Sequence, residues 1–336
     1  MDPAHLGSLI DALAGRAVAV IGDAVADEYV FGRVARVSRE APVLILEYDA
    51  TQVVPGGAGN AANNVAALGG ECALVSLVGR DAPGDRLVRA LHRRVDARFV
   101  VRAPRRPTAV KTRILAGGIH SAKQQVVRID RSVRGPIDAA TRARFERRAL
   151  QAAAQADAVL VSDYGSGLVR PALVAKIRRA ARQDGVPVPV LLDTRYDLLA
   201  YQGLTACTPN ESEVEQALGI RIDDDLQALE RAGRDLLERT RMGAVLITRG
   251  SRGMALFVPD VPTVHIPIHG TDEIADVTGA GDTVVATVTL ALAAGASFEA
   301  AAHLANHAGG LVVMKRGTAT VSAAELRRAV RGGRRG

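Results

Sequence analysis

Short apolar runs alternate along the chain with longer segments in which apolar residues recur every three or four positions. Runs of this kind are typical of strands buried on both faces of a parallel sheet. They occupy residues 17–23, 73–79, 158–163, 189–193 and 244–250. The periodic segments predict helices over 59–69, 83–94, 139–156, 170–183, 223–240, 281–295 and 298–314. The alternation predicts an α/β fold with a doubly wound, mostly parallel sheet flanked by helices.

Two regions break this alternation, because strand patterns follow one another in them without a helix between. They are residues 31–49 and residues 99–130. We predict a small antiparallel β-sheet lid over segments of about 28–48 and 98–130. With no repeat or composition shift, residues 1–336 are predicted to form a single domain. The last ten residues contain five arginines in a Gly-rich sequence, which predicts a frayed, solvated end with a basic tail over 331–336.

Composition excludes several classes of protein. Hydrophobic residues make up 48% and charged residues 24%, which is globular and not disordered. The net charge is +7, but no basic helix accompanies it and aromatics are only 3%, so no nucleic-acid partner is predicted. The longest uncharged stretch, residues 283–298, is shorter than the roughly 20 residues of a membrane span, so no membrane partner is predicted. The two cysteines are far apart and the N-terminus lacks a signal pattern, which favours the cytoplasm.

Polar residues end four of the buried runs. They are Asp23, Asp163, Asp193 and Thr248. Ligands of open α/β sheets bind at the carboxyl ends of the strands, so these residues are candidates for one site. For any one of them, a turn or a helix cap remains the alternative.

The sharpest local motif covers residues 276–282 and leads into a long apolar segment. Gly279 and Gly281 allow a tight turn with free N–H groups, and the start of the following helix favours an anion. Asp282, placed there, could take a proton from a hydroxyl. A Gly-rich turn in which Asp282 caps the helix is an equal alternative.

Two weaker motifs point to a nucleotide. Asn210 and Glu213 form an N-x-x-E that could hold hydrated Mg²⁺ beside phosphates, although a capping box has the same spacing. Thr248, Arg249 and Gly250 follow a buried strand and could contact a nucleotide phosphate.

A Gly-rich segment at 56–60 lets the backbone approach a ligand closely. It also matches the dinucleotide pattern G-x-G-x-x-A, but Pro55 precedes it in place of a buried strand, so we reject that interpretation.

The lid carries an unusual concentration of cations. Only four lysines occur in the chain, and Lys111, Lys123 and Lys315 fall in candidate site regions. Lys111 and Arg113 share one face of a strand and, with Lys123 and Arg128, could form a basic patch that captures a phosphate on the acceptor. A solvent-facing strand that guards a sheet edge is, on general grounds, the commoner arrangement.

Taken together, these motifs resemble those of the ribokinase (PfkB) family of sugar kinases. The matching motifs run in order from about residue 16 to 330: Gly22-Asp23, Gly56-Gly57-x-x-Asn60, Asn210-x-x-Glu213, Thr248-x-Gly250 and Gly279-Ala280-Gly281-Asp282. The resemblance implies a β-lidded α/β fold, ATP as phosphoryl donor, Mg²⁺ as charge neutraliser, and a homodimer formed through the lid.

A narrower resemblance points to the branch that phosphorylates a heptose 7-phosphate. It is carried by residues 36–43, 55–58, 111–113, 124–130 and 315–318. It implies transfer to O1 of D-glycero-β-D-manno-heptose 7-phosphate, in ADP-heptose and lipopolysaccharide synthesis. Because no nucleotidyltransferase segment follows Gly336, we expect the single-function form. A kinase for another sugar or sugar phosphate, and more remotely a non-catalytic binding regulator, are the alternatives.

The resemblance also implies a role for each matching residue. Asp282 would be the base, with Gly279, Ala280 and Gly281 presenting N–H groups to the transferring phosphoryl. Sugar hydroxyls would contact Asp23, Gly56, Gly57, Asn60 and Asp163, and the 7-phosphate would contact Lys111, Arg113, Lys123 and Arg128. Asn210 and Glu213 would organise Mg²⁺, with Asp193, Thr248, Arg249 and Gly250 near the nucleotide. Asp276 and Thr278 would hold a monovalent cation such as K⁺.

Overall fold

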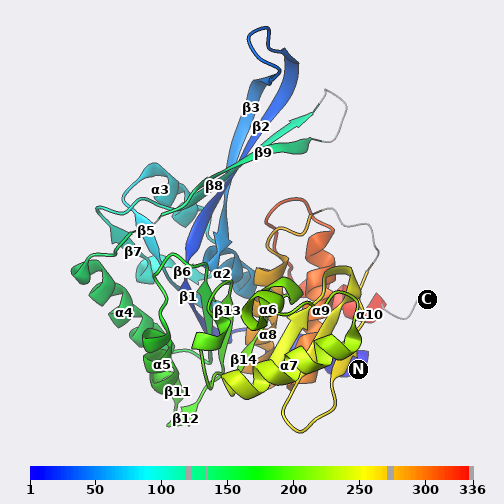
Figure 1. The fold of residues 1–336 in the computed structure, drawn as a ribbon. Helices are drawn as coiled ribbons and strands as arrows, with labels where there is room; N and C mark the ends of the chain where they lie inside the picture. The colour runs from blue at the N-terminus through cyan, green and yellow to red at the C-terminus, as the bar shows by residue number, and fades with distance from the viewer. Residues whose placement is uncertain (118–122, 134, 271–275, 333–336) are drawn as a thin grey trace.

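A nine-stranded sheet forms the centre of the computed structural model, which describes residues 1–117, 123–133, 135–270 and 276–332 (Figure 1). Neighbouring strands from β6 to β15 are parallel, and β16 and β17 add antiparallel strands at one edge. In spatial order the strands are β17 (Val264–Ile266), β16 (Met254–Phe257), β15 (Ala244–Thr248), β14 (Ala206–Cys207), β13 (Val190–Thr194), β10 (Ala158–Asp163), β1 (Ala17–Gly22), β4 (Glu71–Val75) and β6 (Val95–Asp96).

Helices cover both faces of this sheet, and each face has its own apolar core. One core contains α1 (Pro3–Ala12), α2 (Ala58–Ala67), α8 (Ala280–Ala293), α9 (Phe298–Val313) and α10 (Ala323–Gly332). The other contains α4 (Ala139–Ala153), α5 (Pro171–Ala180) and α7 (Leu226–Thr240). The central strand β10 is buried along its whole length, as expected of a strand between two helical layers.

The predicted fold class is confirmed, and strands lie in each of the five apolar runs. The run at 73–79 is divided, because β5 (Leu77–Gly79) leaves the main sheet and pairs with β7 (Val101–Ala103). The remaining short elements are α3 (Ala82–Arg89), α6 (Glu211–Leu218), the hairpin strands β11 (Arg182–Gln183) and β12 (Val186–Pro187), and the 3₁₀ turns η1 (Ala97–Phe99), η2 (Leu198–Ala200) and η3 (Gly250–Arg252).

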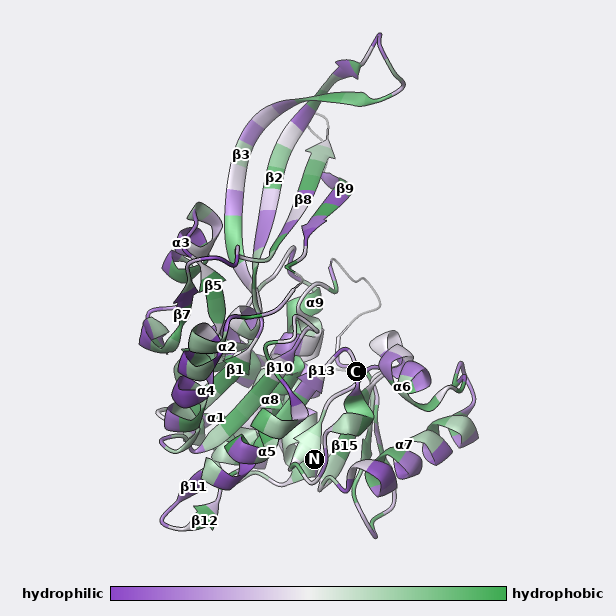
Figure 2. Cartoon of the chain, turned by 60° about the vertical axis from the view of Figure 1, so that its left-hand side comes forward, coloured by the Kyte–Doolittle hydropathy of each residue, from purple (hydrophilic) through white to green (hydrophobic). Residues whose placement is uncertain are grey.

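A four-stranded sheet, which we call the lid, projects from the main body (Figure 1). Its order is β3 (Leu44–Gly57), β2 (Ala24–Val37), β8 (Val110–Gly117) and β9 (Gln124–Arg131). The two outer pairs are antiparallel, but the central pair β2–β8 is parallel. The reason is connectivity, because the chain passes through α2, β4 and α3 in the main body before it enters β8 from the same end as β2. Hydrophilic and hydrophobic bands alternate along β2 and β3 (Figure 2).

The C-terminal segment differs from the sequence prediction. The chain stays helical to Gly332, so much of the expected solvated end belongs to α10. Leu326 and Val330, four residues apart, are buried against the core, and Arg327 forms an ion pair with Asp11 of α1. Residues 333–336 of the predicted tail lie outside the described residues. In the part of the chain that is described, no helix is long and apolar enough to cross a membrane.

Candidate active site

Asp282 lies in the first turn of α8, at the start of a long apolar helix. The helix begins after Gly279, which has a φ of +78°. A Cβ on Gly279 would lie 2.5 Å from Nδ2 of Asn60, so no larger residue fits without displacing that amide. A Cβ on Gly281 would meet no atom within 4 Å, which leaves open space in front of the N-terminal turn. The turn therefore combines free space with the positive end of a helix dipole.

The carboxylate of Asp282 is buried and held by two donors. Asn60 Nδ2 donates to Oδ2 at 2.9 Å, and the hydroxyl of Tyr164 donates to Oδ1 at 2.8 Å. Burial raises the pKa of Asp282 to about 6, against the two hydrogen bonds, which favour the charged form. At neutral pH the group is therefore largely ionised and poised to accept a proton.

The two strand-end carboxylates Asp23 and Asp163 bind the loop that carries Tyr164. Asp23 accepts hydrogen bonds from the Tyr164 N–H at 2.9 Å and from the Ser166 hydroxyl, and burial raises its pKa. Asp163 accepts one from the Gly165 N–H at 3.0 Å, within the same loop, and another from the Tyr201 hydroxyl at 2.7 Å. Both carboxylates therefore stabilise the turn, which is the alternative that the sequence left open for such residues. Asp23 also borders a cavity.

The Gly-rich segment at the end of β3 brings Asn60 to Asp282. Gly57 has a φ of +57°, and a Cβ there would lie 2.5 Å from the carbonyl oxygen of Asp23. A Cβ on Gly56 would lie 2.3 Å from a carboxylate oxygen of Asp27. These two glycines let the end of β3 pair with the start of β2, and the first turn of α2 then places Asn60 against the N-terminus of α8.

A cavity of about 670 Å³ lies between the base of the lid and the loop of Tyr164. Two cations in its lining face the tyrosine ring. Nζ of Lys111 lies 5.3 Å from the ring centroid, and the guanidinium carbon of Arg195 lies 4.5 Å from it. Burial and the charge of Arg195 lower the pKa of Lys111. No carboxylate of the described chain lies within ion-pair distance of either cation, so an anion between them would be stabilised.

The other three lid cations already have carboxylate partners. Arg113 forms an ion pair with Asp27 at 2.6 Å, with both side chains about nine-tenths buried. Lys123 pairs with Asp49, and Arg128 with Asp130 at 2.8 Å. Arg113 and Lys123 border a second cavity of about 920 Å³, while Lys111 borders the first and Arg128 borders both. The residues of the predicted basic patch are thus divided between two cavities.

The N-x-x-E motif forms a complete capping box at the start of α6. Asn210 Oδ1 accepts from the Glu213 N–H, and Glu213 Oε2 accepts from the Asn210 N–H, both at 2.9 Å. The capping box, which the sequence left open as the alternative to a Mg²⁺ site, is therefore fully formed. One carboxylate oxygen of Glu213 remains available for another partner.

Asp193, Asp282 and Glu213 influence one another electrostatically near this capping box, and Arg195 is the cation that partly offsets their charge. Burial raises the pKa of Asp193 to about 8, with further contributions from the charges of Asp282 and Glu213. A divalent cation would relieve this repulsion. No group of three or more His, Cys, Asp or Glu side chains in the described chain is arranged to hold a metal alone, so such an ion would depend on water and phosphate ligands.

The remaining predicted residues occupy two separate places. Thr248 pairs with Asn210 in a parallel bridge, Arg249 binds Glu211 at 2.8 Å, and Gly250 begins η3. Asp276 accepts from the Thr278 N–H at 2.9 Å and from the Gly317 N–H at 3.0 Å, beside the second cavity. Residues 271–275, which precede this turn, lie outside the described residues.

The sequence profile of the pfkB family carbohydrate kinases matches residues 16–325. The chain belongs to the pfkB family of carbohydrate kinases. Membership makes it a sugar kinase that uses ATP, a divalent cation and a sugar acceptor.

Among curated pfkB relatives, the bifunctional protein HldE of Geobacter metallireducens is 44% identical over 309 residues. The match covers 91% of this chain and 61% of the relative. The bifunctional protein HldE of Caulobacter vibrioides is 44% identical over 333 residues, which are 97% of this chain and 65% of that protein. The chain therefore spans somewhat less than two thirds of the length of these two relatives.

Solved structures of more distant kinases share the fold. Arabidopsis thaliana ribokinase, complexed with ribose and ATP, superposes with a TM-score of 0.69 at 22% identity, covering 95% of this chain and 98% of that one. Escherichia coli phosphofructokinase-2, in complex with potassium, gives a TM-score of 0.74 at 18% identity, covering 95% of this chain and 99% of that one.

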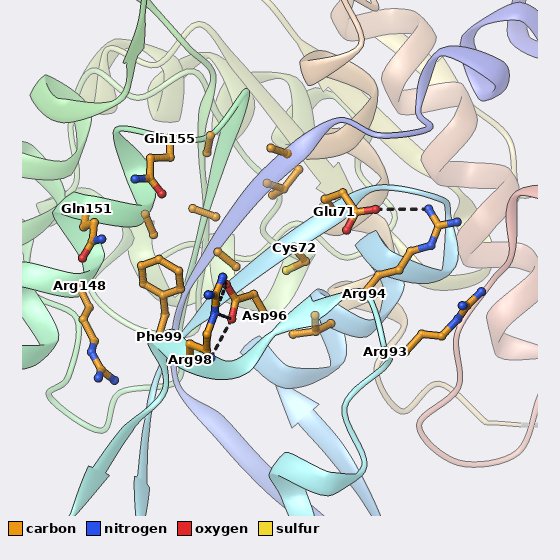
Figure 3. A pocket seen from close by; sticks show the side chains of 17 residues that line it. Glu71, Cys72, Arg93, Arg94, Asp96, Arg98, Phe99, Arg148, Gln151 and Gln155 are labelled. Atoms are coloured by element: carbon orange, nitrogen blue, oxygen red, sulfur yellow. Dashed lines mark hydrogen bonds and ion pairs between the residues drawn. The ribbon is translucent and has the colours of Figure 1, made fainter.

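A further cavity of about 780 Å³ lies at the opposite edge of the sheet, beside the amino ends of β1 and β4 (Figure 3). Arginines dominate its charged lining, but Arg98 pairs with Asp96 and Arg94 with Glu71. Ligands of open α/β sheets bind at the carboxyl ends of the strands, so we place the kinase site at the edge that holds Asp282.

Sequence reasoning missed three contributors to the site, Tyr164, Arg195 and Asp27, and placed Lys315 near it. Tyr164 directly follows a strand-ending aspartate, so the strand-end argument could have found it. Asp27 forms an ion pair with Arg113 from the neighbouring strand, although the β2–β8 register places it opposite Lys111, so only the side-chain geometry reveals that pair. Lys315, expected near the site, instead binds Glu325 and the Thr320 carbonyl and fastens α10.

Proposed function

We propose that this kinase transfers the γ-phosphoryl group of ATP to O1 of D-glycero-β-D-manno-heptose 7-phosphate, giving the 1,7-bisphosphate. The observation that carries this proposal is a buried carboxylate at a helix N-terminus, Asp282, joined through Tyr164 to a cavity lined by Lys111 and Arg195, which have no ion-pair partner among the described residues. The carboxylate suits an alcohol acceptor, and the cations suit an acceptor that already carries a phosphate. The choice of heptose rests on the motifs that resemble the heptose-phosphate branch.

The transfer step follows from the surroundings of Asp282. Its carboxylate accepts the proton of the anomeric hydroxyl as O1 attacks the γ-phosphorus. The new O1–P bond forms while the bond from phosphorus to the bridging oxygen of ADP breaks. The Gly281 N–H and the dipole of α8 stabilise the charge on the transferring group, whereas the Ala280 N–H already donates to the Val277 carbonyl at 3.2 Å. Such transfer depends mostly on positioning and charge stabilisation.

The carboxylates beside the capping box fit a hydrated Mg²⁺. We propose that Asp193, Glu213 and Asn210 hold it through water, since Asp193 lies among several carboxylates that Arg195 only partly offsets and Glu213 has an oxygen to spare. When bound, Mg²⁺ neutralises charge on the phosphates of ATP. Thr248, Arg249 and Gly250 are proposed to border the nucleotide, and Asp276 and Thr278 to hold K⁺.

The acceptor is proposed to lie between the glycine segment and the lid. Asn60 and Asp23 would contact its hydroxyls, together with Gly56, Gly57 and Asp163. Of the lid cations, Lys111 is the strongest candidate for the 7-phosphate because it has no carboxylate partner in the described chain, whereas Arg113, Lys123 and Arg128 would each need to share theirs.

We further propose that two copies of the chain pair through the lid. Its strands expose apolar side chains that a monomer would leave in water, among them Val37 at 59%, Tyr48 at 67% and Ile129 at 50% exposure. Sedimentation should show a dimer, and Ile129→Lys should dissociate it; a monomeric wild type would contradict this assignment.

We propose a cytoplasmic location, because the cytoplasm supplies ATP and suits the two buried, unpaired cysteines.

An acceptor panel tests the proposed reaction. ADP release is measured with heptose 7-phosphate, the unphosphorylated heptose, fructose 6-phosphate and ribose as acceptors. Heptose 7-phosphate should give the highest kcat/KM. A higher value for another sugar phosphate would reassign the acceptor within the same family, and a preference for an unphosphorylated sugar would remove the role given to the cations.

A further inference from the structure

Tyr164 joins the base to the cations of the cavity. Its hydroxyl donates to Oδ1 of Asp282 at 2.8 Å, while Lys111 and Arg195 lie against its ring. Its side chain is thus the direct contact between the carboxylate proposed to take the proton and the two charges proposed to face the acceptor phosphate. The fold alone does not require this bond, because the loop is anchored through its backbone and Ser166.

We propose that Tyr164 is a positioning residue for phosphoryl transfer: its hydroxyl, together with the Asn60 amide, fixes the carboxylate of Asp282 toward the acceptor hydroxyl. The inference rests on the proposed role of Asp282. Each carboxylate oxygen receives one of the two donors, so rotation about the Cβ–Cγ bond would break both hydrogen bonds. A second lone pair on each oxygen remains for the incoming hydroxyl.

The phenol is itself held in place by its surroundings. The Tyr164 N–H donates to Asp23, and a Cβ on Gly57 would lie 3.3 Å from the tyrosine ring, so the ring packs closely on the glycine segment. Lys111 and Arg195 attract the negatively charged faces of the ring. An acceptor phosphate that binds these two cations would therefore also influence the position of the ring whose hydroxyl orients Asp282.

The hydrogen bond has a defined electrostatic sign. Donation from Tyr164 favours the ionised form of Asp282 and so lowers its pKa, against the effect of burial. Burial and the negative charge of Asp282 hold the pKa of Tyr164 well above its usual value, so the phenol remains a donor throughout the working pH range. The charged and polar groups that influence or contact this carboxylate are Asn60 on α2, Asp27 on β2, Tyr164 after β10, and Asp193 and Arg195 at the end of β13.

Tyr164→Phe is the test, because it removes the hydroxyl and keeps the ring and the loop anchors. Tyr201→Phe is the matched control, since Tyr201 donates the same kind of bond, at 2.7 Å, to Asp163. The acid limb of kcat against pH should move upward by about one pH unit in Tyr164→Phe, with kcat roughly tenfold lower, and should stay in place in Tyr201→Phe. The KM for ATP should stay unchanged in Tyr164→Phe.

A second measurement keeps this inference separate from the identity of the acceptor. The Asp282 carboxyl carbon is titrated by ¹³C NMR in the free enzyme and assigned by its loss in Asp282→Asn. An upward shift of its pKa in Tyr164→Phe supports the inference even if heptose 7-phosphate is not phosphorylated, in which case only the acceptor is wrong. An unchanged pKa, or equal losses of kcat in both variants with unmoved acid limbs, would overturn it.

Discussion

Replacing Asp282 with asparagine should separate catalysis from stability. The side chain is buried and keeps its shape in Asp282→Asn, and both neighbouring groups can still be satisfied. The new carbonyl accepts from Asn60, and the new amide donates to the oxygen of Tyr164 after its hydroxyl turns. We therefore expect a folded enzyme that binds ATP and the sugar phosphate.

The stability change can be worked from the pKa of Asp282. A folded value of about 6, against an ordinary value of 3.8, corresponds to about 3 kcal/mol, since each pKa unit is worth about 1.4 kcal/mol. Because the folded pKa is the higher one, protonation contributes stability that is fully present below about pH 4 and lost as the pH rises through 6. At pH 8 the folded wild type therefore loses this free energy by holding Asp282 ionised and buried, whereas the neutral asparagine of the variant does not.

The variant should thus be more stable than wild type at pH 8, by up to about 3 kcal/mol, and the difference should shrink toward pH 4. Its kcat should fall roughly 10²–10⁴-fold, the usual loss for a general base. Urea unfolding at two pH values measures the first effect, and ADP release with saturating substrates the second. A kcat within a few-fold of wild type, or a variant that is less stable at pH 8, would refute this reasoning.

Three further substitutions test the remaining contacts. Lys111→Ala should raise the KM for the sugar phosphate roughly tenfold or more and leave the KM for ATP unchanged in steady-state kinetics; an unchanged acceptor KM would remove the phosphate-binding role from Lys111. Arg113→Ala strands the buried carboxylate of Asp27, so urea unfolding should show a loss of about 3–5 kcal/mol; a loss below 1 kcal/mol would contradict the buried pair. Gly279→Ala should lower the melting temperature because of its positive φ and the nearby Asn60 amide, whereas Gly281→Ala, with open space, should not; equal effects would contradict this geometry.

Much of the fold followed from local pattern. Buried parallel strands and amphipathic helices each have a short-range signature, so the order of strands and helices could be predicted from single segments. The parallel β2–β8 pair could not, because it depends on which strands meet after a long connection. The helix at the C-terminal end was missed for a related reason: Leu326 and Val330 are apolar at helical spacing, but the arginines around them led to the prediction of a solvated end.

The site residues that depend on backbone conformation could be predicted from the sequence. The ion-pair partners of the charged side chains could not be predicted as well. Gly57 and Gly279 marked positive-φ turns that bring Asn60 to Asp282, and glycine at a tight turn is visible in sequence. Which lid cations are neutralised was not visible. Arg113 and Lys111 share a strand face, and Asp27 is the register partner of Lys111, yet its carboxylate forms its ion pair with the guanidinium of Arg113 two residues further along β8.

The most direct test of the proposed chemistry is the position of the new phosphate. Purified enzyme, ATP and heptose 7-phosphate are incubated, and the product is examined by ³¹P and ¹H NMR. The proposed mechanism predicts a second phosphorus signal coupled to the anomeric proton, absent when Asp282→Asn replaces the wild type. A new phosphate coupled to any other sugar proton, or an anomeric phosphate formed equally fast by the variant, would contradict it.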